Sequence, residues 1–206
     1  YSMALYGSFT PAPDLFIDGV LGGSILEFDS IRFVTPTGLI ASGDVGGTQL
    51  FGSITFAYER REDDWMVSPY GRLEFSRSRI ESFTEFDAGV YSLAYGDQQV
   101  DGLSANLGLR AYDTIELPFG LLRPELRGEY GYDFAGRSSM SLGYADLNSL
   151  TYSTLAGRTA RDHLDVSLLL DLQLAQGWGI GTGYRTRLGS GSRMSHTVDV
   201  HVDVLF

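Results

Sequence analysis

Charged side chains recur at every second position in several parts of the chain. The clearest row runs through Arg123, Glu125, Arg127 and Glu129, where positive and negative charges alternate. Residues two positions apart lie on the same face of a β-strand, so this row would place its charges on one surface. Such a surface can hold water and polar groups by ion pairing and hydrogen bonding.

Ten charged side chains in such alternating segments are candidates for one common polar surface. As a set they predict a polar conduit, in which a water-filled lumen surrounds an extended chain. For any single residue, the favoured interpretation is a lattice of ion pairs that only stabilises the wall. The ten predicted lumen-lining residues are Arg72, Glu74, Arg110, Arg123, Glu125, Arg127, Glu129, Asp165, Asp171 and Arg185.

Other kinds of chemistry find little support in the sequence. Cysteine is absent, which excludes a disulfide scaffold, thiolate metal ligands and cysteine nucleophiles. His163, His196 and His201 are too scattered to predict a metal site. No phosphate-binding glycine loop or nucleophile elbow occurs, so we expect no catalytic residue and no cofactor. The net charge of −11 and the lack of a basic stripe argue against nucleic-acid binding.

The elements that must carry these side chains are β-strands. In His163–Leu174, apolar residues from Leu164 to Leu172 alternate with polar ones, and Leu169 is the one apolar exception. Period-two alternation is typical of a strand with two different faces. Nine segments have this pattern: Ser2–Phe9, Leu15–Phe28, Gln49–Glu59, Trp65–Arg79, Leu103–Tyr112, Leu122–Phe134, His163–Leu174, Trp178–Arg187 and Met194–Phe206.

The connections between these segments alternate between short and long. Short turns on one side and long polar loops on the other are typical of outer-membrane β-barrels. The predicted short connections are Thr10–Asp14, Glu62–Asp64, Asp113–Phe119 and Ala175–Gly177, and the long ones are Asp29–Gly47, Ile80–Asp101, Ala135–Asp162 and Gly189–Arg193.

Length and hydropathy allow a membrane barrel. No run of about 18 apolar residues occurs, so no transmembrane helix is predicted. Alternating lipid-facing and lumen-facing residues average the hydropathy of a barrel toward zero, and a hydrophobic content of 43% is therefore compatible with one. The alternative is a soluble β-sandwich, but its strands commonly have only about 5–6 residues.

The last segment ends in a row of apolar residues. Val198, Val200, Val202, Val204 and Phe206 share one face of the predicted strand. An edge strand offers unpaired N–H and C=O groups to a partner, and its terminal aromatic ring would anchor at the membrane interface. We interpret these residues as a C-terminal assembly signal for the barrel-assembly machinery. An ordinary edge strand that stops at a phenylalanine is the simpler alternative.

Several motifs resemble the C-terminal β-barrel translocator domain of autotransporters. The most specific are VSPYGRLEFSRSR at Val67–Arg79 and LLRPELRGEYGYDF at Leu121–Phe134. QLFGSITFA at Gln49–Ala57 and QVDGLSANLGLR at Gln99–Arg110 add to the match, which spans almost the whole chain. The resemblance implies an all-β, antiparallel, up-and-down transmembrane β-barrel of twelve strands, of which about nine are visible here.

The resemblance also implies a function and a location. Residues 1–206 would be one translocator domain that is truncated at its N-terminus, without signal peptide, passenger and linker helix. It would anchor and translocate an N-terminal passenger to the cell surface by type V secretion, and it would not be an enzyme. The expected partners are lipid of the Gram-negative outer membrane, the barrel-assembly machinery, and its own passenger and linker helix.

Two other functions stay open at this point. The main alternative is a passenger-free outer-membrane porin or adhesin barrel. A barrel enzyme, such as an outer-membrane lipase or protease, is a further possibility that no residue present supports.

Overall fold

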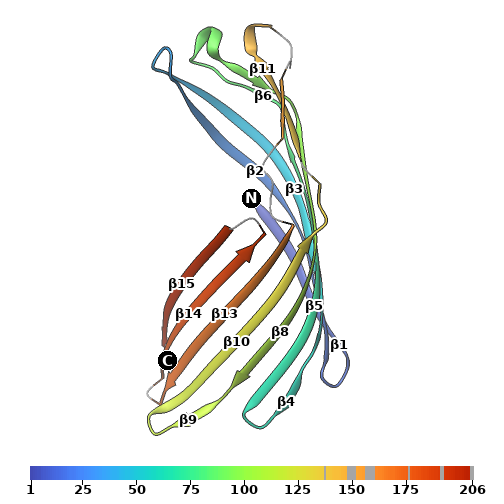
Figure 1. Ribbon diagram of the computed structural model, residues 1–206, viewed down its shortest axis with the longest axis vertical. Helices are drawn as coiled ribbons and strands as arrows, with labels where there is room; N and C mark the ends of the chain where they lie inside the picture. The colour runs from blue at the N-terminus through green and yellow to red at the C-terminus, as the bar shows by residue number, and fades with distance from the viewer. Residues whose placement is uncertain (137, 148–151, 156–160, 176, 191–192, 205–206) are drawn as a thin grey trace.

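The chain forms one long, curved antiparallel sheet with a smaller sheet at one end (Figure 1). The structure is a computed structural model, and it describes residues 1–136, 138–147, 152–155, 161–175, 177–190 and 193–204. The main path of the large sheet consists of nine strands in chain order, which confirms the nine predicted segments. They are β1 (Ser2–Ala12), β2 (Leu15–Val34), β3 (Leu39–Tyr58), β5 (Trp65–Ile80), β8 (Gln98–Asp113), β10 (Gly120–Asp133), β13 (Asp162–Leu174), β14 (Trp178–Gly189) and β15 (Arg193–Val204).

Short elements complete the fold. The strands β4 (Arg60–Glu62) and β9 (Ile115–Leu117) extend the hairpins that lead into β5 and β10. In the described parts of the chain, no helix has the length and apolar character needed to cross a membrane. The second sheet has the order β12 (Tyr152–Leu155), β11 (Ser139–Tyr144), β7 (Leu93–Tyr95) and β6 (Phe83–Thr84), and the 3-10 helices are η1 (Gly89–Tyr91) and η2 (Ala145–Leu147).

The predicted loop at Asp29–Gly47 is largely wrong. The pairing of β2 with β3 continues without a break from Leu26 opposite Gly47 to Val34 opposite Leu39. The polar and glycine-rich sequence suggested a loop, but the backbone hydrogen bonds between the strands do not depend on side-chain type. The chain reverses only at Thr35–Gly38, where Gly38 has a φ of 72° and donates its N–H to Val34 O at 2.8 Å.

The other connections follow the predicted asymmetry, with a difference in detail. Short turns join the strands at one end of the large sheet, and the long connections from β5 to β8 and from β10 to β13 lie at the other end (Figure 1). The connection at Gly189–Arg193, predicted to be long, is short, because β14 ends at Gly189 and β15 begins at Arg193. The predicted loops at Ile80–Asp101 and Ala135–Asp162 are not purely irregular, because they contain the four strands of the small sheet. We call the end of the molecule that carries this small sheet the loop end.

The two faces of the large sheet differ in polarity. Apolar residues are exposed and polar residues are buried, which is the reverse of the arrangement in a soluble protein. On β13, Leu164, Val166, Leu168 and Leu170 are 36–43% exposed. The polar residues between them are buried, with 8% exposure for Asp165 and 6% for Ser167. A soluble sandwich would bury the leucine face against a second sheet, so that alternative is excluded.

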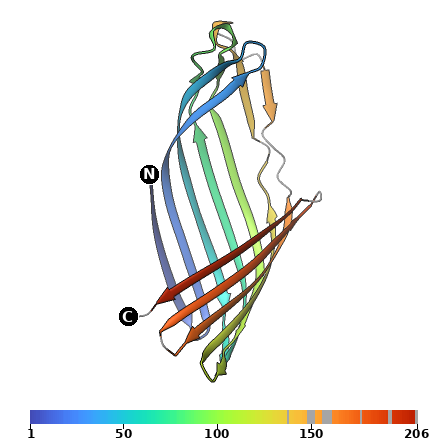
Figure 2. The same cartoon turned by 90° about the vertical axis from the view of Figure 1, so that its left-hand side faces the viewer.

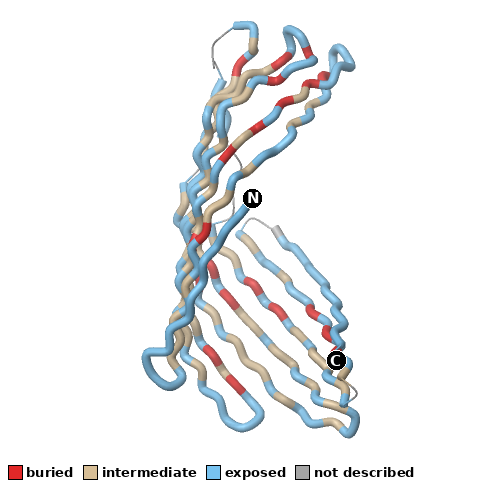
Figure 3. The backbone as a smooth tube through the Cα atoms, turned by 180° about the vertical axis from the view of Figure 1, so that it is seen from behind, coloured by how far each residue is buried: buried red, intermediate tan, exposed pale blue. Residues whose placement is uncertain are grey.

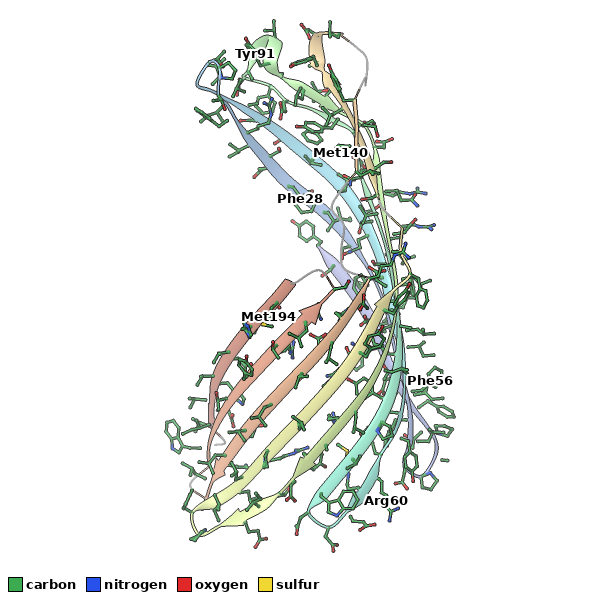
Figure 4. All side chains as sticks on the ribbon, viewed as in Figure 1. Phe28, Phe56, Arg60, Tyr91, Met140 and Met194 are labelled. Carbon is green, nitrogen blue, oxygen red and sulfur yellow. The ribbon has the colours of Figure 1, made fainter. Side chains whose placement is uncertain are left out.

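The sheet is curled into an open trough (Figures 1 and 2). Phe28 projects from its concave side and Phe56 from its convex side (Figure 4). Among the described residues, β1 pairs only with β2 and β15 only with β14, so the sheet has two open edges. The edge strand β1 is exposed along its whole length (Figure 3).

Candidate functional site

The candidate site is the concave polar surface of the large sheet, which we call the inner face. Strand register assigns each side chain to it, because residues directly opposite one another share a face. Arg110 lies opposite Arg127, and Glu129 lies opposite Asp165. By the same register and period-two alternation, all ten predicted lumen-lining residues lie on the inner face. Their role in lining a lumen stays a prediction.

Glu129 is the centre of the largest network on the inner face. Its side chain is only 6% exposed, and it accepts hydrogen bonds from Tyr70 Oη at 2.6 Å, Arg72 Nη2 at 2.8 Å and Arg127 Nη2 at 2.9 Å. Arg127 also donates from Nε to Tyr70 Oη at 2.6 Å, and its guanidinium lies 5.0 Å from the centre of that ring. One carboxylate therefore pairs with two partly buried cations and also accepts a hydrogen bond from a phenol.

This network crosses an intervening strand. Tyr70 and Arg72 come from β5, Glu129 comes from β10, and β8 runs between them. Gly108 of β8 makes the crossing possible, because a Cβ at this position would lie 2.2 Å from Tyr70 Cζ. The glycine thus leaves room for the tyrosine ring to lie across β8 and reach Glu129.

Further ion pairs extend the lattice along the inner face. Glu74 lies 2.9 Å from Arg72 Nε and accepts hydrogen bonds from Ser104 and Asn106. Asp165 accepts two hydrogen bonds from Arg187, each of 2.8 Å. Two hollows open onto this face, and their linings include Asp18, Glu59, Ser68, Tyr70, Arg72, Arg110, Arg127, Glu129, Asp165, Ser167, Arg185 and Arg187.

Not all predicted residues join this lattice. Arg123 lies over the ring of Tyr112, 3.7 Å from its centre, and Asp171 lies 3.3 Å from His201. Within the described ranges, Glu125 and Arg185 form no ion pair. The structure therefore divides the ten residues into a central network around Glu129 and more isolated charges.

The sequence interpretation missed several members of the network. Tyr70 was absent from the predicted set because an aromatic ring carries no charge, although it lies in phase with Arg72 on the same strand. Arg187 lies two positions after Arg185 and could have been found by the same alternation. Glu59 pairs with Arg110 at 3.3 Å, and it could have been found by the same alternation, because it is the last polar residue of the predicted segment Gln49–Glu59.

The predicted C-terminal assembly residues lie on the convex side of an edge strand. Val198, Val200, Val202 and Val204 are all exposed there. Phe206 lies outside the described residues. The geometry of an exposed apolar row on an open edge agrees with the proposed signal, and the recognition event itself stays a prediction.

An ion pair outside the membrane-spanning part ties the loop end together. Arg32 Nε donates to Glu85 Oε1 at 2.9 Å, and Leu93 N and Tyr95 Oη donate to the same carboxylate. Burial alone would raise the pKa of Glu85, but the hydrogen bonds from Arg32 and Leu93 outweigh it, and the net pKa is lowered. The tip of the β2–β3 hairpin is thereby fastened to the connection between β5 and β8.

We expect this tie to depend on pH. Because the pKa of Glu85 is lower in the folded protein than in the unfolded chain, the tie stabilises the loop end at neutral pH. This stability is fully present above the ordinary pKa of about 4.5 and is lost as the pH falls through the lowered folded value. Limited proteolysis between residues 81 and 97 should be slow at pH 7 and fast only in strong acid. Glu85→Gln should make cleavage fast both at pH 7 and in strong acid. Fast cleavage of the wild type between residues 81 and 97 already at pH 6 would contradict the prediction.

The geometry and the comparisons with known proteins define the class of protein. A curled antiparallel sheet with an apolar convex face and a charged concave face is the wall of a transmembrane β-barrel. Residues 1–185 match the family described as autotransporter beta-domain, and the chain belongs to that family. The family consists of translocator domains in the outer membrane of Gram-negative bacteria, and its function is passenger translocation rather than catalysis.

Two curated relatives support the same assignment. The chain is similar to "Esterase EstA" of Pseudomonas aeruginosa and to "Esterase EstA" of Pseudomonas putida. Each is 26% identical over 181 residues, which cover 84% of this chain and 27% of the relative. The chain thus spans about a quarter of the length of these relatives.

Proposed function

We propose that this domain anchors its protein in the outer membrane of a Gram-negative bacterium and lets an N-terminal passenger reach the cell surface. The observation that carries the proposal is the reversed polarity of the sheet, with leucines exposed on the convex face and the carboxylates of Glu129 and Asp165 buried on the concave face. Lipid hydrocarbon would cover the first face, and water and the passenger would occupy the space beside the second.

The inner face suits an extended polypeptide in transit. Backbone N–H and C=O groups that are left unpaired in hydrocarbon cost several kcal/mol each, so an extended chain needs a hydrated path across the membrane. The ten predicted residues would supply that path, and the same charges would afterwards hold a linker helix. No nucleotide is required in this scheme, because folding of the passenger outside the cell biases its movement.

A closed barrel needs partners for the open edges at β1 and β15. The strands β1 and β15 carry unpaired backbone groups along their outer edges, which lipid cannot satisfy. We propose that the whole protein closes the barrel with three further strands, placed between β15 and β1. The exposed valines on β15 would be read during assembly by the barrel-assembly machinery, which pairs with open strand edges.

The relatives suggest where any catalytic activity would lie. Both relatives are named as esterases, yet this chain covers only 27% of their length. We propose that an activity of the whole protein belongs to its passenger, and that the barrel domain only positions the passenger at the surface.

The proposal is tested with the full-length protein in intact Gram-negative cells. An epitope tag in the passenger should be cleaved by added protease, and the barrel should fractionate with the outer membrane. In gel electrophoresis without boiling, the barrel should migrate differently from the boiled sample. Recovery of the barrel in the detergent-free soluble fraction, or a protected passenger beside a folded barrel, would overturn the proposal.

A further inference from the structure

Positive charge is distributed very unevenly between the two faces of the large sheet. All 15 basic residues of the chain are arginines. On the nine long strands, the arginine side chains that the structure describes lie on the inner face with two exceptions. The exceptions are Arg77 and Arg79, which are neighbours on the convex face of β5.

These two arginines lie where the apolar band of the convex face ends. Strand register aligns Phe75 with Leu103 in the last row toward the loop end that is apolar on both β5 and β8. The next row on this face contains Arg77 between Asp101 of β8 and Leu50 of β3, and the row after that contains Arg79 between Gln99 and Thr48. Both guanidinium groups therefore lie at the level where hydrocarbon gives way to head groups, on the side of the long loops.

The hydrogen bonds of Arg77 leave most of its guanidinium free. Its Nε donates to Asp101 Oδ1 at 2.7 Å, and Gln99 Nε2 donates to Asp101 Oδ2 at 2.8 Å. Asp101 is thus held by two neighbours and fixes the direction of the Arg77 side chain, which is 57% exposed. Within the described ranges, the two terminal nitrogens of Arg77 have no hydrogen-bond partner in the protein.

Arg79 adds a second cation next to the first. It forms no ion pair within the part of the chain that the structure describes, and Thr48 and Gln99 flank it on the neighbouring strands. Residues two positions apart on a strand lie about 6.6–6.8 Å from each other. Glu81, just past the end of β5, and Asp97 line the same hollow as Arg79 on the loop side, but neither forms an ion pair with it among the described residues.

The opposite boundary of the sheet shows a different arrangement. Arg60 of β4 lies opposite Val67 on the convex face, but Glu62 neutralises it through a contact of 2.6 Å. An outward arginine at the turn end is therefore paired within the protein, whereas Arg79 at the loop end forms no ion pair among the described residues. This contrast indicates that the loop end meets an anion from outside the chain.

We propose that Arg77 and Arg79 bind the phosphate of a lipid head group in the external leaflet of the membrane. The planar guanidinium matches phosphate oxygens through two parallel hydrogen bonds, and such charge-assisted bonds strengthen where water is scarce. Asp101 orients the site, and the apolar row at Phe75 and Leu103 receives the acyl chains of the same lipid. This inference rests on the proposed insertion of the domain into the outer membrane.

The test uses the full-length protein reconstituted into phosphatidylcholine vesicles, with or without diphosphorylated lipid A. After extraction in mild detergent, lipid A that stays bound to the protein is quantified by mass spectrometry. We expect Arg77→Gln combined with Arg79→Gln to reduce retained lipid A at least about tenfold, while Arg60→Gln retains it as the wild type does. Lipid A without its phosphates should be retained as poorly by the wild type as by the double variant.

Each other outcome has a defined meaning. Equal retention by the wild type and the double variant would overturn the inference, and so would displacement of lipid A by millimolar inorganic phosphate, which would show a site for a free anion. Gel migration that changes on boiling reports insertion separately. If the wild type fails to insert into either vesicle, the proposed function fails, whereas normal insertion without specific retention overturns the inference alone.

Discussion

Replacement of Glu129 with alanine is expected to lower the free energy of unfolding of the inserted domain by about 3–5 kcal/mol. The carboxylate accepts hydrogen bonds from Tyr70, Arg72 and Arg127 in a site where its own side chain is only 6% exposed. Its removal leaves the partly buried Arg127 without an acidic partner among the described residues, and Arg72 keeps only Glu74. The cost therefore comes mainly from the charges that remain, and much less from the hydrogen bonds that disappear.

Unfolding by urea in lipid vesicles, followed by tryptophan fluorescence, measures this loss. The matched control is Glu62→Ala, which removes the partner of Arg60 in an exposed pair where Glu62 is 52% exposed. That variant should unfold like the wild type, because exposed ion pairs contribute little. Equal free energies of unfolding for Glu129→Ala and Glu62→Ala would show that the inner-face network does not stabilise the fold. Glu129→Gln should fall between them, since its amide oxygen can still accept the Tyr70 hydrogen bond.

The structure of this network bears on the two interpretations of the charged rows. Arg72 and Arg127 both donate to Glu129, and we infer that these three residues chiefly support the wall. Arg185 forms no ion pair among the described residues, and we propose that it is available to a chain in transit. We infer that stability and passage depend on different members of the same face.

Alternation predicted the strands because period two follows directly from backbone geometry. In a membrane barrel each strand would have one face toward lipid and one toward polar surroundings, so its sequence would retain the pattern. The continuation of β2 from Asp29 to Val34 was missed, because its polar and glycine-rich surroundings suggested a loop. Val34 is buried there with Ala41 and Ala88 in a small apolar cluster, and a contact between three separate segments cannot be seen in a single sequence.

The partners within the site could not be predicted from alternation alone. The contact of Tyr70 with Glu129 crosses β8 and depends on the absence of a side chain at Gly108. The tie between Arg32 and Glu85 joins residues 53 positions apart through a connection that has little regular structure. Such contacts follow from register and curvature, and a single sequence does not specify either of them.

The second large effect is expected from arginine at Leu168, on the convex face of β13. This side chain is 43% exposed and lies in the middle of the apolar row, opposite Leu126 of β10 and Tyr184 of β14. If lipid covers that row, Leu168→Arg places a charge in hydrocarbon and should cost about 2–4 kcal/mol near the midplane. The variant should insert poorly into vesicles, with most of the protein migrating alike before and after boiling.

Leu169 provides the matched control, because it is the same residue one position later and faces the concave side. It lies opposite Glu125 on β10 and opposite Gly183 on β14, where the Asp199 carboxylate lies over the glycine, so an arginine there gains acidic neighbours. We expect Leu169→Arg to insert almost as well as the wild type. Comparison of the two variants in one vesicle assay separates the environments of the two faces, since the substitution is identical and only its direction differs. The reverse order, with Leu169→Arg the more damaging, would mean that water covers the leucines and protein packs on the charged side, and a membrane barrel would then be ruled out.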